Sequence, residues 1–417
     1  MAASPPERPR RHLKPDDLRA AAQLATQATL GVIGITEGVH QAVRRRVGLS
    51  AGDAPERAGG LTGRVYRAIR GVAQGLGAGV DGVLQAVLPL LDDPARAGAG
   101  DSPAREAVVA ALNGVLGDRL AAMGNALAQP MEMRRAERVL PLSRADRFQD
   151  ALGPCRPHVL LMVHGLCMND TQWRRNGHDH TDVLSEALQA TPVRLRYNSG
   201  LRIAANGREL AQMLERLMDH WPVPPQGITV VGHSMGGLLA RSAWHEGRRA
   251  QHRWPALVKH LVFLGTPHHG APLERAGHGA DLLLASSPYS APLARLGRLR
   301  SAGITDLRYG HLRHPDEGRI DAPLPLPEGV ACFGVAACLA PRRGLLAERL
   351  VGDGLVPLRS ALGEHDEPAR RLVFARGNLR VVHRTGHLDL LSSPEVAAQL
   401  RQWLAAAPPA SPVASGA

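Results

Sequence analysis

The stretch Ile228-Thr229-Val230-Val231-Gly232-His233-Ser234-Met235-Gly236 decides the fold of this chain. Its first four residues form an apolar run, and a helical pattern begins at Met235. The apolar run predicts a buried strand, and Gly232 and Gly236 let the backbone turn sharply without a Cβ clash. Such a turn exposes the hydroxyl of Ser234 beside the N-terminus of a helix. The stretch therefore predicts a strand, a tight turn that carries an exposed serine, and a helix.

Apolar strands and amphipathic helices alternate on both sides of this turn. An edge strand is expected within 131–142, and further strands at 158–163, 192–196, 228–231, 257–264, 330–337 and 371–374. Helices are expected at 206–219 and 235–247, and a last helix begins after Ser392 or Ser393, with Pro394 in its first turn. This alternation predicts an α/β fold with a mostly parallel sheet and helices on both faces.

The first 130 residues have a different pattern. Three helical patterns, at about 17–46, 61–91 and 103–127, each carry one apolar stripe that must be buried against a partner. Their glycines suit either close packing on the main domain or an interfacial or oligomerising role, and Gln74 and Asp81 argue against a membrane-spanning helix. The expected organisation is a disordered N-terminus (1–17), a helical region (18–130), the α/β domain (131–407) and a disordered tail (408–417).

A Leu- and Pro-rich segment at 271–328 is inserted between two expected strands. Two interpretations stay open, a lid over an apolar acyl pocket and extra packing helices.

Three segments complete a serine-based site. His164-Gly165-Leu166 follows the first strong strand, so that the backbone N–H groups of Leu166 and Met235 could stabilise an oxyanion. Asp353 lies between two glycines after a strand, and His387 precedes the last helix. The order Ser234, Asp353, His387 predicts a triad in which His387 accepts the serine proton and Asp353 fixes the tautomer of the imidazole.

Other residues compete for these roles. Asp366, Glu364 and Asp306 are alternative acids, and His383, His365, His268 and His269 are alternative bases. His164 is expected to brace the oxyanion loop and His233 to be structural. The run His178-Asp179-His180 lacks a clear third ligand, so no metal site is predicted. Cys167 is expected to be a small buried side chain.

These segments together resemble the lipase and esterase branch of the α/β-hydrolases. The resemblance rests on Val163-His164-Gly165-Leu166, Gly232-His233-Ser234-Met235-Gly236-Gly237, Leu264-Gly265-Thr266-Pro267-His268-His269-Gly270, Asp353-Gly354-Leu355-Val356 and His387-Leu388-Asp389. The resemblance covers about residues 155–405. The same segments are also similar to the hydrolase domain of GPI inositol-deacylase-like proteins and to uncharacterised bacterial esterases. The resemblance implies hydrolysis of carboxylic esters through an acyl-enzyme without a cofactor. Some secreted members hold calcium at the position of Asp389, but no second acidic ligand is evident here, so Asp389 is expected to be a local hydrogen-bonding group.

Composition narrows the expected partners and location. The net charge of +12 comes almost entirely from arginines spread along the chain, without a dense basic block, so no nucleic-acid partner is predicted. A solvated basic surface is the expected explanation, with attraction to anionic lipid as the alternative. Met1 to Asp17 has no signal-like apolar run and the four cysteines show no disulfide pattern, so a cytoplasmic protein is expected, with peripheral membrane attachment left open.

The sequence thus predicts a serine ester hydrolase that acts on a small-molecule or lipid ester. A thioesterase or amidase with the same triad is one alternative. A non-catalytic hydrolase-like protein that docks on membranes is the other. Substrate identity and oligomeric state are not predicted.

Overall fold

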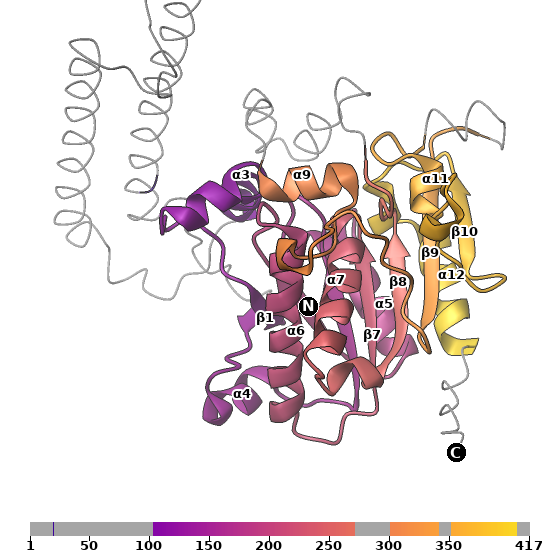
Figure 1. Ribbon diagram of the computed structural model, residues 1–417. Coiled ribbons are helices and arrows are strands. Elements are labelled where there is room, and N and C mark those ends of the chain that lie inside the picture. Colours follow the sequence, from indigo (N-terminus) through magenta and orange to yellow (C-terminus); the bar gives the residue numbers. More distant parts are fainter. Residues whose placement is uncertain (1–19, 21–102, 272–300, 342–351, 407–417) are drawn as a thin grey trace, which may run out of the picture. The chain divides into compact units, whose positions relative to one another are not determined.

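The predicted strands form a sheet in the computed structural model, which describes residue 20 and residues 103–271, 301–341 and 352–406. Within these residues the main sheet has eight strands in the order β10-β9-β8-β7-β3-β6-β1-β2 (Figure 1). Their bounds are β1 Glu132–Arg135, β2 Arg138–Val139, β3 His158–Val163, β6 Ala190–Arg196, β7 Gly227–His233, β8 Val258–Leu264, β9 Ala331–Cys338 and β10 Leu379–His383. The pairs from β10 to β6 are all parallel, which confirms the mostly parallel sheet.

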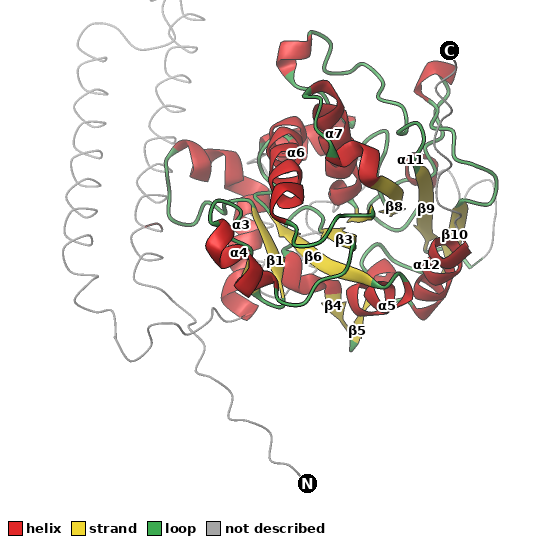
Figure 2. Ribbon diagram, turned by 90° about the horizontal axis from the view of Figure 1, so that it is seen from below, coloured by secondary structure: helices red, strands yellow, loops and turns green. Residues whose placement is uncertain are grey.

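Helices cover both faces of this sheet. Figure 2 shows α6 and α7 on one face and α5 and α12 on the other. The helical bounds are α3 Pro103–Ala122, α4 Ala145–Leu152, α5 His180–Ala187, α6 Ile203–His220, α7 Met235–Arg249, α9 Ala302–Tyr309, α11 Leu358–Ala361 and α12 Pro394–Ala406. Central strands such as β7 are buried along their whole length, because helices pack against them from both sides. Among the described residues, no helix combines the length and apolar character needed to cross a bilayer.

The strand order places the serine turn at the centre of the sheet. The chain leaves β3 to form β6 on one side and then returns to form β7 on the other side. In such sheets, ligands bind at the carboxyl ends of the strands where the strand order reverses. Ser234 follows the carboxyl end of β7 directly, so it lies at this position.

The two edges of the sheet differ from the sequence prediction in instructive ways. The expected edge strand within 131–142 is a short hairpin, in which β1 pairs antiparallel with β2 and with β6. The expected strand at 371–374 is wrong, because this segment follows the 3₁₀ turn Pro368–Arg370 without joining the sheet and leaves Val373 85% exposed. The outermost strand at this edge of the sheet, next to β9, is β10 instead. As an edge strand it buries only Val382, so it lacks the apolar run that marks a buried strand.

The described part of the N-terminal region also differs from the expected boundary. The chain divides into two compact units, Met1–Arg105 with Gly124–Leu127, and Glu106–Met123 with Ala128–Ala417. Most of α3 therefore belongs with the sheet, whereas the expected boundary at residue 130 separated the two. Within this unit the Gly117 carbonyl of α3 accepts a hydrogen bond of 2.9 Å from Asn198, and the Gly114 carbonyl accepts one of 2.7 Å from Ser301. Apart from residue 20, the two earlier helical patterns lie outside the described residues, as do both expected disordered ends.

The expected insertion at 271–328 is described at residue 271 and from residue 301 onward, where it includes α9. Figure 1 shows α9 beside α3. The N-terminal end of α9 is fixed to the loop after β6, since the Gly303 N–H donates to the Gly200 carbonyl (2.9 Å) and Asp306 accepts from the Ile203 N–H (3.0 Å) and from Arg202 (3.0 Å). This packing explains how α9 is held. The role of the whole insertion as a lid stays a prediction.

Candidate active site

Ser234 lies on a tight turn, as its flanking glycines predict, and its own backbone is strained. Ser234 has φ 54° and ψ −124°, a conformation that non-glycine residues rarely adopt. Its N–H donates to the Leu264 carbonyl of β8 (2.8 Å), which ties the turn to the neighbouring strand. A Cβ added at Gly232 would lie 2.5 Å from the Gly237 nitrogen, and one at Gly236 would lie 2.2 Å from the Val163 carbonyl oxygen. Both glycines are therefore required for this turn.

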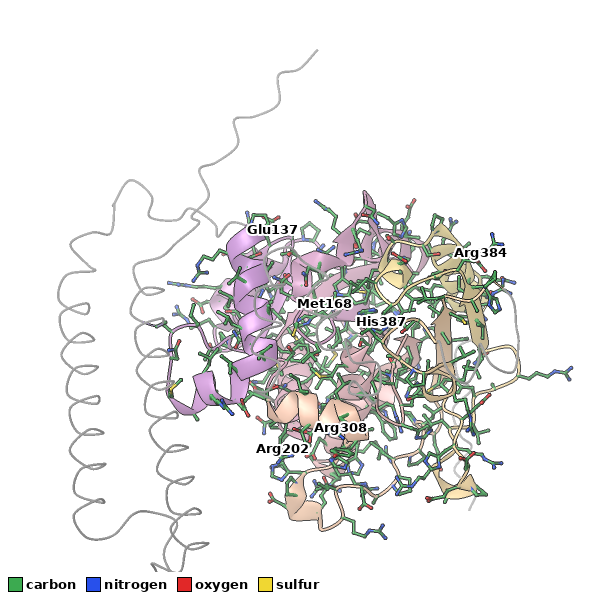
Figure 3. The ribbon with its side chains drawn as sticks, turned by 90° about the horizontal axis from the view of Figure 1, so that it is seen from above. Glu137, Met168, Arg202, Arg308, Arg384 and His387 are labelled. Atoms are coloured by element: carbon green, nitrogen blue, oxygen red, sulfur yellow. The ribbon has the colours of Figure 1, made fainter. Side chains whose placement is uncertain are left out.

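Asp353 and His387 form a buried acid–imidazole pair. Asp353 Oδ2 lies 2.7 Å from His387 Nδ1, and the two side chains are 1% and 2% exposed. Asp353 Oδ1 accepts the backbone N–H groups of Leu355 (3.0 Å) and Val356 (2.8 Å), and the His387 N–H donates to the Asp353 carbonyl (3.2 Å). An ionised carboxylate can only accept hydrogen bonds, so His387 Nδ1 carries the hydrogen and Nε2 carries a lone pair. Figure 3 shows His387 in the interior, whereas the exposed Arg384 lies at the margin.

The pair lies close to the serine turn. His233 Nε2 donates to the His387 carbonyl (3.2 Å), and the two imidazole rings are 4.7 Å apart. A Cβ added at Gly265, the residue after Leu264, would lie 3.2 Å from His387 Cε1. His387 Nε2 is buried and has no hydrogen-bond partner among the described residues, so the Ser234–His387 hydrogen bond is not formed in this structure. The loop that carries His387 is thus held against His233, which precedes Ser234, and against Gly265, which follows the residue that accepts the Ser234 N–H.

The loop after β3 is braced as expected and lies against Ser234. His164 Nδ1 donates to the Gly165 carbonyl (2.9 Å), and the His164 ring stacks on Tyr197, 4.4 Å between ring centres. Burial lowers the pKa of His164 to about 4, which keeps the ring neutral. A Cβ added at Gly165 would lie 3.0 Å from Ser234 Cβ. No acceptor is found among the described residues for the N–H groups of Leu166 and Met235, the two expected oxyanion donors.

The competing acids are engaged elsewhere. Asp366 (2.7 Å) and Glu364 (3.6 Å) are exposed and pair with Arg359, whereas Asp306 is bound to α6. Asp389 accepts the Gly386 N–H (3.0 Å), as expected for a local hydrogen-bonding group.

The competing histidines also have other partners. His383 Nδ1 lies 3.3 Å from the Ala340 carbonyl oxygen, His268 contacts Arg241, and His269 lies against His365, 5.0 Å between ring centres. In the run 178–180, Asp179 caps α5 and pairs with Arg194, while His180 Nε2 donates to the Leu390 carbonyl (2.8 Å). The described residues contain no cluster of three side chains suited to a metal ion.

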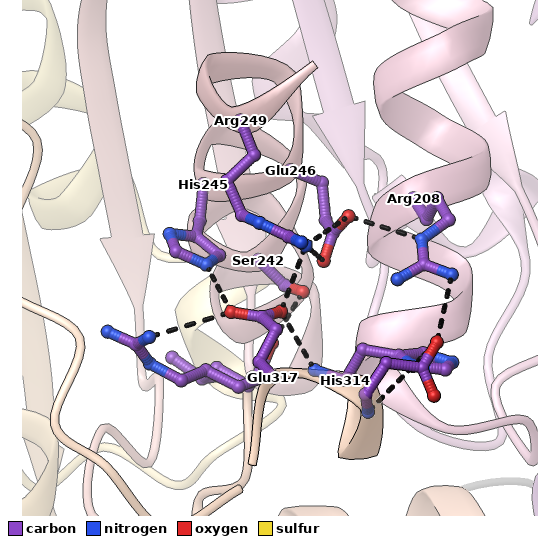
Figure 4. A network of polar contacts seen from close by, with 10 residues as sticks. Arg208, Ser242, His245, Glu246, Arg249, His314 and Glu317 are labelled. Carbon is purple, nitrogen blue, oxygen red and sulfur yellow. Dashed lines mark hydrogen bonds and ion pairs between the residues drawn. The ribbon is translucent and has the colours of Figure 1, made fainter. Parts of the chain in front are cut away.

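Sequence reasoning missed two further imidazole pairs. Arg241 of α7 donates to His268 Nδ1 (3.3 Å) inside the domain. On the same helix, His245 Nε2 lies 2.8 Å from Glu317 within a larger network of charged groups (Figure 4). Arg241 could have been recognised from the sequence as a functional candidate. It is a charged residue among apolar ones on a helix that packs against the sheet, and such a residue is rarely buried without a partner.

Comparison with known proteins bears on part of this site. Residues 156–285 match the model of a family described as the PGAP1-like alpha/beta domain. This segment contains β3, β6, β7, β8 and Ser234, but neither Asp353 nor His387. No curated protein matches the chain in sequence.

The chain is also similar to several solved structures. Mature Bacillus licheniformis lipase BlEst2 is 19% identical over 60% of this chain and 93% of that chain, with a TM-score of 0.38. EstA from Clostridium botulinum is 11% identical over 62% and 90%, with a TM-score of 0.41. A Pyrobaculum calidifontis esterase is 18% identical over 61% and 77%, with a TM-score of 0.35. The strand order and the serine turn of the chain itself define an α/β-hydrolase fold.

Proposed function

We propose that this chain is a serine ester hydrolase that cleaves hydrophobic carboxylic esters through an acyl-enzyme on Ser234. The observation that carries the proposal is the buried Asp353–His387 pair at 2.7 Å, held beside a serine on a strained strand-to-helix turn. A buried carboxylate on Nδ1 leaves the lone pair on Nε2, which is the form of imidazole that can accept a proton.

The acylation step uses this lone pair. Ser234 Oγ attacks the ester carbonyl carbon while His387 Nε2 accepts the hydroxyl proton, and Asp353 stabilises the imidazolium that forms. The Ser234–His387 hydrogen bond must form as the substrate is engaged, which is common because catalytic hydrogen bonds tighten in the complex. The N–H groups of Leu166 and Met235 stabilise the oxyanion, and each such donor is worth roughly 3–4 kcal/mol.

The second half of the reaction reverses the proton transfer. The tetrahedral intermediate breaks to the acyl-enzyme, and the alcohol leaves with the proton from His387 Nε2. Water then attacks the acyl carbon while His387 accepts its proton. The second intermediate breaks to release the acid, and Ser234 regains its hydrogen.

The test measures turnover and covalent labelling together. The full chain is assayed with p-nitrophenyl esters of increasing acyl length and treated with a fluorophosphonate probe. Ser234→Ala should lose the label and at least about 10³-fold in kcat. Ser242→Ala is the matched control, because Ser242 is buried on the same helix and donates to the Leu312 carbonyl (2.8 Å). The control should keep both label and turnover. Full labelling and activity in Ser234→Ala would refute the proposal.

Acyl-chain preference tests the substrate class separately. A rise in kcat/KM from short to long acyl chains supports a hydrophobic substrate, whereas turnover that falls with chain length contradicts that part. Faster turnover of acyl-CoA than of simple esters would favour a thioesterase instead.

A further inference from the structure

A cavity separate from the catalytic pair lies beside α7. Its volume is about 80 Å³, several times the roughly 10–15 Å³ that one water molecule requires by the same measure. Its wall includes Arg241 of α7, His268 of the loop after β8, and Arg371. None of Ser234, Asp353 and His387 lines it.

Among the described residues, Arg241 is a buried cation without a counter-ion. The residue is 3% exposed, its Nη1 donates to His268 Nδ1 (3.3 Å), and its Nη2 donates to the Leu324 carbonyl. Its Nε is buried and has no partner among the described residues, and no carboxylate there pairs with the guanidinium. Burial lowers the pKa of Arg241 only to about 10, so the side chain stays charged at neutral pH. An unpaired buried charge is strongly unfavourable, and an anion in the cavity would compensate it.

His268 supplies a second unused donor. A guanidinium can only donate hydrogen bonds, so His268 Nδ1 accepts from Arg241 and the ring hydrogen lies on Nε2. His268 Nε2 is buried and has no partner among the described residues. Burial, together with the Arg241 charge, holds the pKa of His268 well below 6.5, so the ring is neutral and Nε2 remains an N–H donor.

The remaining charged groups of the wall leave it positive. Within the described part of the chain, Arg371 donates to the backbone carbonyls of His365 (2.8 Å) and Asp366 (3.1 Å) and pairs with no carboxylate. Arg370 pairs with Glu367 (3.0 Å) and lies 3.8 Å from Asp321. Asp321 also pairs with Arg319 (3.1 Å) and is the one carboxylate among the wall residues that the structure describes. Three arginines therefore face one carboxylate that is already paired.

We propose that this cavity binds a phosphate group, with Arg241 Nε–H and His268 Nε2–H as buried donors and Arg371 as a further positive charge. Phosphate oxygens accept several charge-assisted hydrogen bonds, and arginine is well suited to provide them. The site is near the serine turn. Arg241 follows Ser234 by seven residues on one helix, about 10 Å along its axis, and His268 follows Leu264, whose carbonyl accepts from the Ser234 N–H. The phosphate could come from the solution or from the substrate itself.

The first experiment measures binding without any ester. The melting temperature of the full chain is followed over a concentration series of sodium phosphate, with NaCl used to hold the ionic strength constant. Wild type should show a saturable rise. Arg241→Gln should raise the apparent Kd at least about tenfold, as expected for a lost charge-assisted hydrogen bond.

Two other variants keep this experiment decisive. His268→Phe keeps an aromatic ring against Phe263 and removes the Nε2–H donor, so it should raise the Kd at least about fivefold even if Arg241→Gln does not fold. Arg253→Gln, at a 66% exposed arginine paired with Glu215 and Asp219, should leave the phosphate response unchanged. No saturable rise in wild type, or an unchanged Kd in His268→Phe, would overturn the proposal.

The second experiment distinguishes the two sources and rests on the proposed function. Hydrolysis of 1-oleoylglycerol is compared with that of 1-oleoylglycerol 3-phosphate. If the substrate carries the phosphate, the second ester should have an at least about tenfold higher kcat/KM, and Arg241→Gln should lower this kcat/KM by a larger factor than that of the neutral ester. Equal rates, with the first experiment positive, assign the site to free phosphate. No hydrolysis of either ester counts against the proposed function and leaves the binding result as it stands.

Discussion

His387 and His268 are both buried imidazoles near the same serine turn, yet their partners give them opposite chemistry. His387 Nδ1 faces a carboxylate at 2.7 Å, and His268 Nδ1 faces a guanidinium at 3.3 Å. The carboxylate accepts and the guanidinium donates, so the ring hydrogen lies on Nδ1 in His387 and on Nε2 in His268. The first ring presents a lone pair and the second presents a donor. The partner of a buried histidine therefore decides whether it can act as a base or as an anion ligand.

The largest expected effect comes from giving His387 the tautomer of His268. Asp353→Asn keeps an oxygen that can accept from Leu355 and Val356, but its amide N–H₂ can donate to His387 Nδ1. The hydrogen then moves to Nε2 and the base is lost, so kcat should fall by about 10⁴-fold at neutral pH. The measurement is steady-state turnover of the best p-nitrophenyl ester.

The control for this substitution is Asp366→Asn, at an exposed acid that pairs with Arg359. It should leave kcat within about twofold of wild type, as expected for a surface change. If Asp353→Asn lost less than tenfold, the tautomer argument for His387 would be wrong.

A smaller effect should follow from moving the loop that lies against Ser234. A Cβ in Gly165→Ala would lie 3.0 Å from Ser234 Cβ and 3.2 Å from His233 Nδ1, so the loop must shift by a few tenths of an ångström. The Leu166 N–H would move with it, and kcat should fall by roughly 10- to 100-fold. The melting temperature should change little, because the shift is small and local.

Gly329→Ala is the control, and it should have the opposite effect: lower stability with an unchanged kcat. Gly329 is exposed, has φ 74°, and a Cβ added there would meet nothing within 4 Å. The substitution should destabilise the fold by about 1 kcal/mol through backbone strain and leave kcat unchanged. Equal kcat in Gly165→Ala and wild type would show that this loop does not position an oxyanion donor.

The sequence predicted the structure best where the local backbone allows only one residue type. Gly232 and Gly236 flank the serine because no Cβ fits at either position, and this requirement is visible as a motif. The pairing of Asp353 with His387, 34 positions later, was instead anticipated from the position of one residue after a strand and of the other before the last helix. The glycine requirement depends on local backbone geometry, which a sequence pattern records directly.

The features that the sequence did not reveal depend on contacts between distant segments. Arg241 and His268 are 27 positions apart, and nothing in either segment shows that a guanidinium would meet an imidazole. Edge strand β10 went unrecognised for a related reason. It pairs with β9 through its backbone and buries only Val382, whereas 371–374 is more apolar and lies outside the sheet. Apolar content predicts burial better than it predicts pairing.

The smallest expected effect on turnover concerns the third imidazole pair. His245 Nε2 lies 2.8 Å from Glu317, almost as close as His387 lies to Asp353, and Arg249 (3.3 Å) and Arg313 (3.5 Å) also contact this carboxylate (Figure 4). Ser242, which Figure 4 shows near this pair, donates to the Leu312 carbonyl (2.8 Å) from within α7 and lies on no strained turn, so the pair should contribute to stability alone. Glu317→Gln should lower the free energy of unfolding by about 1–3 kcal/mol, because a 7% exposed carboxylate loses charged partners. Its kcat should equal that of wild type.

The pH dependence and a neighbouring acid sharpen this test. Burial raises the pKa of Glu317, but hydrogen bonds from His245 and the His314 N–H and the Arg249 charge outweigh it, so the pKa lies below 4.5. A depressed folded-state pKa stabilises the fold above the unfolded value, so the difference between wild type and Glu317→Gln should be full at pH 7 and shrink as pH falls below about 4.5. Asp316→Asn, at a 70% exposed acid, should change stability by less than about 0.5 kcal/mol. Urea unfolding at several pH values measures both variants. A constant difference across that range would mean that Glu317 acts by packing rather than by charge.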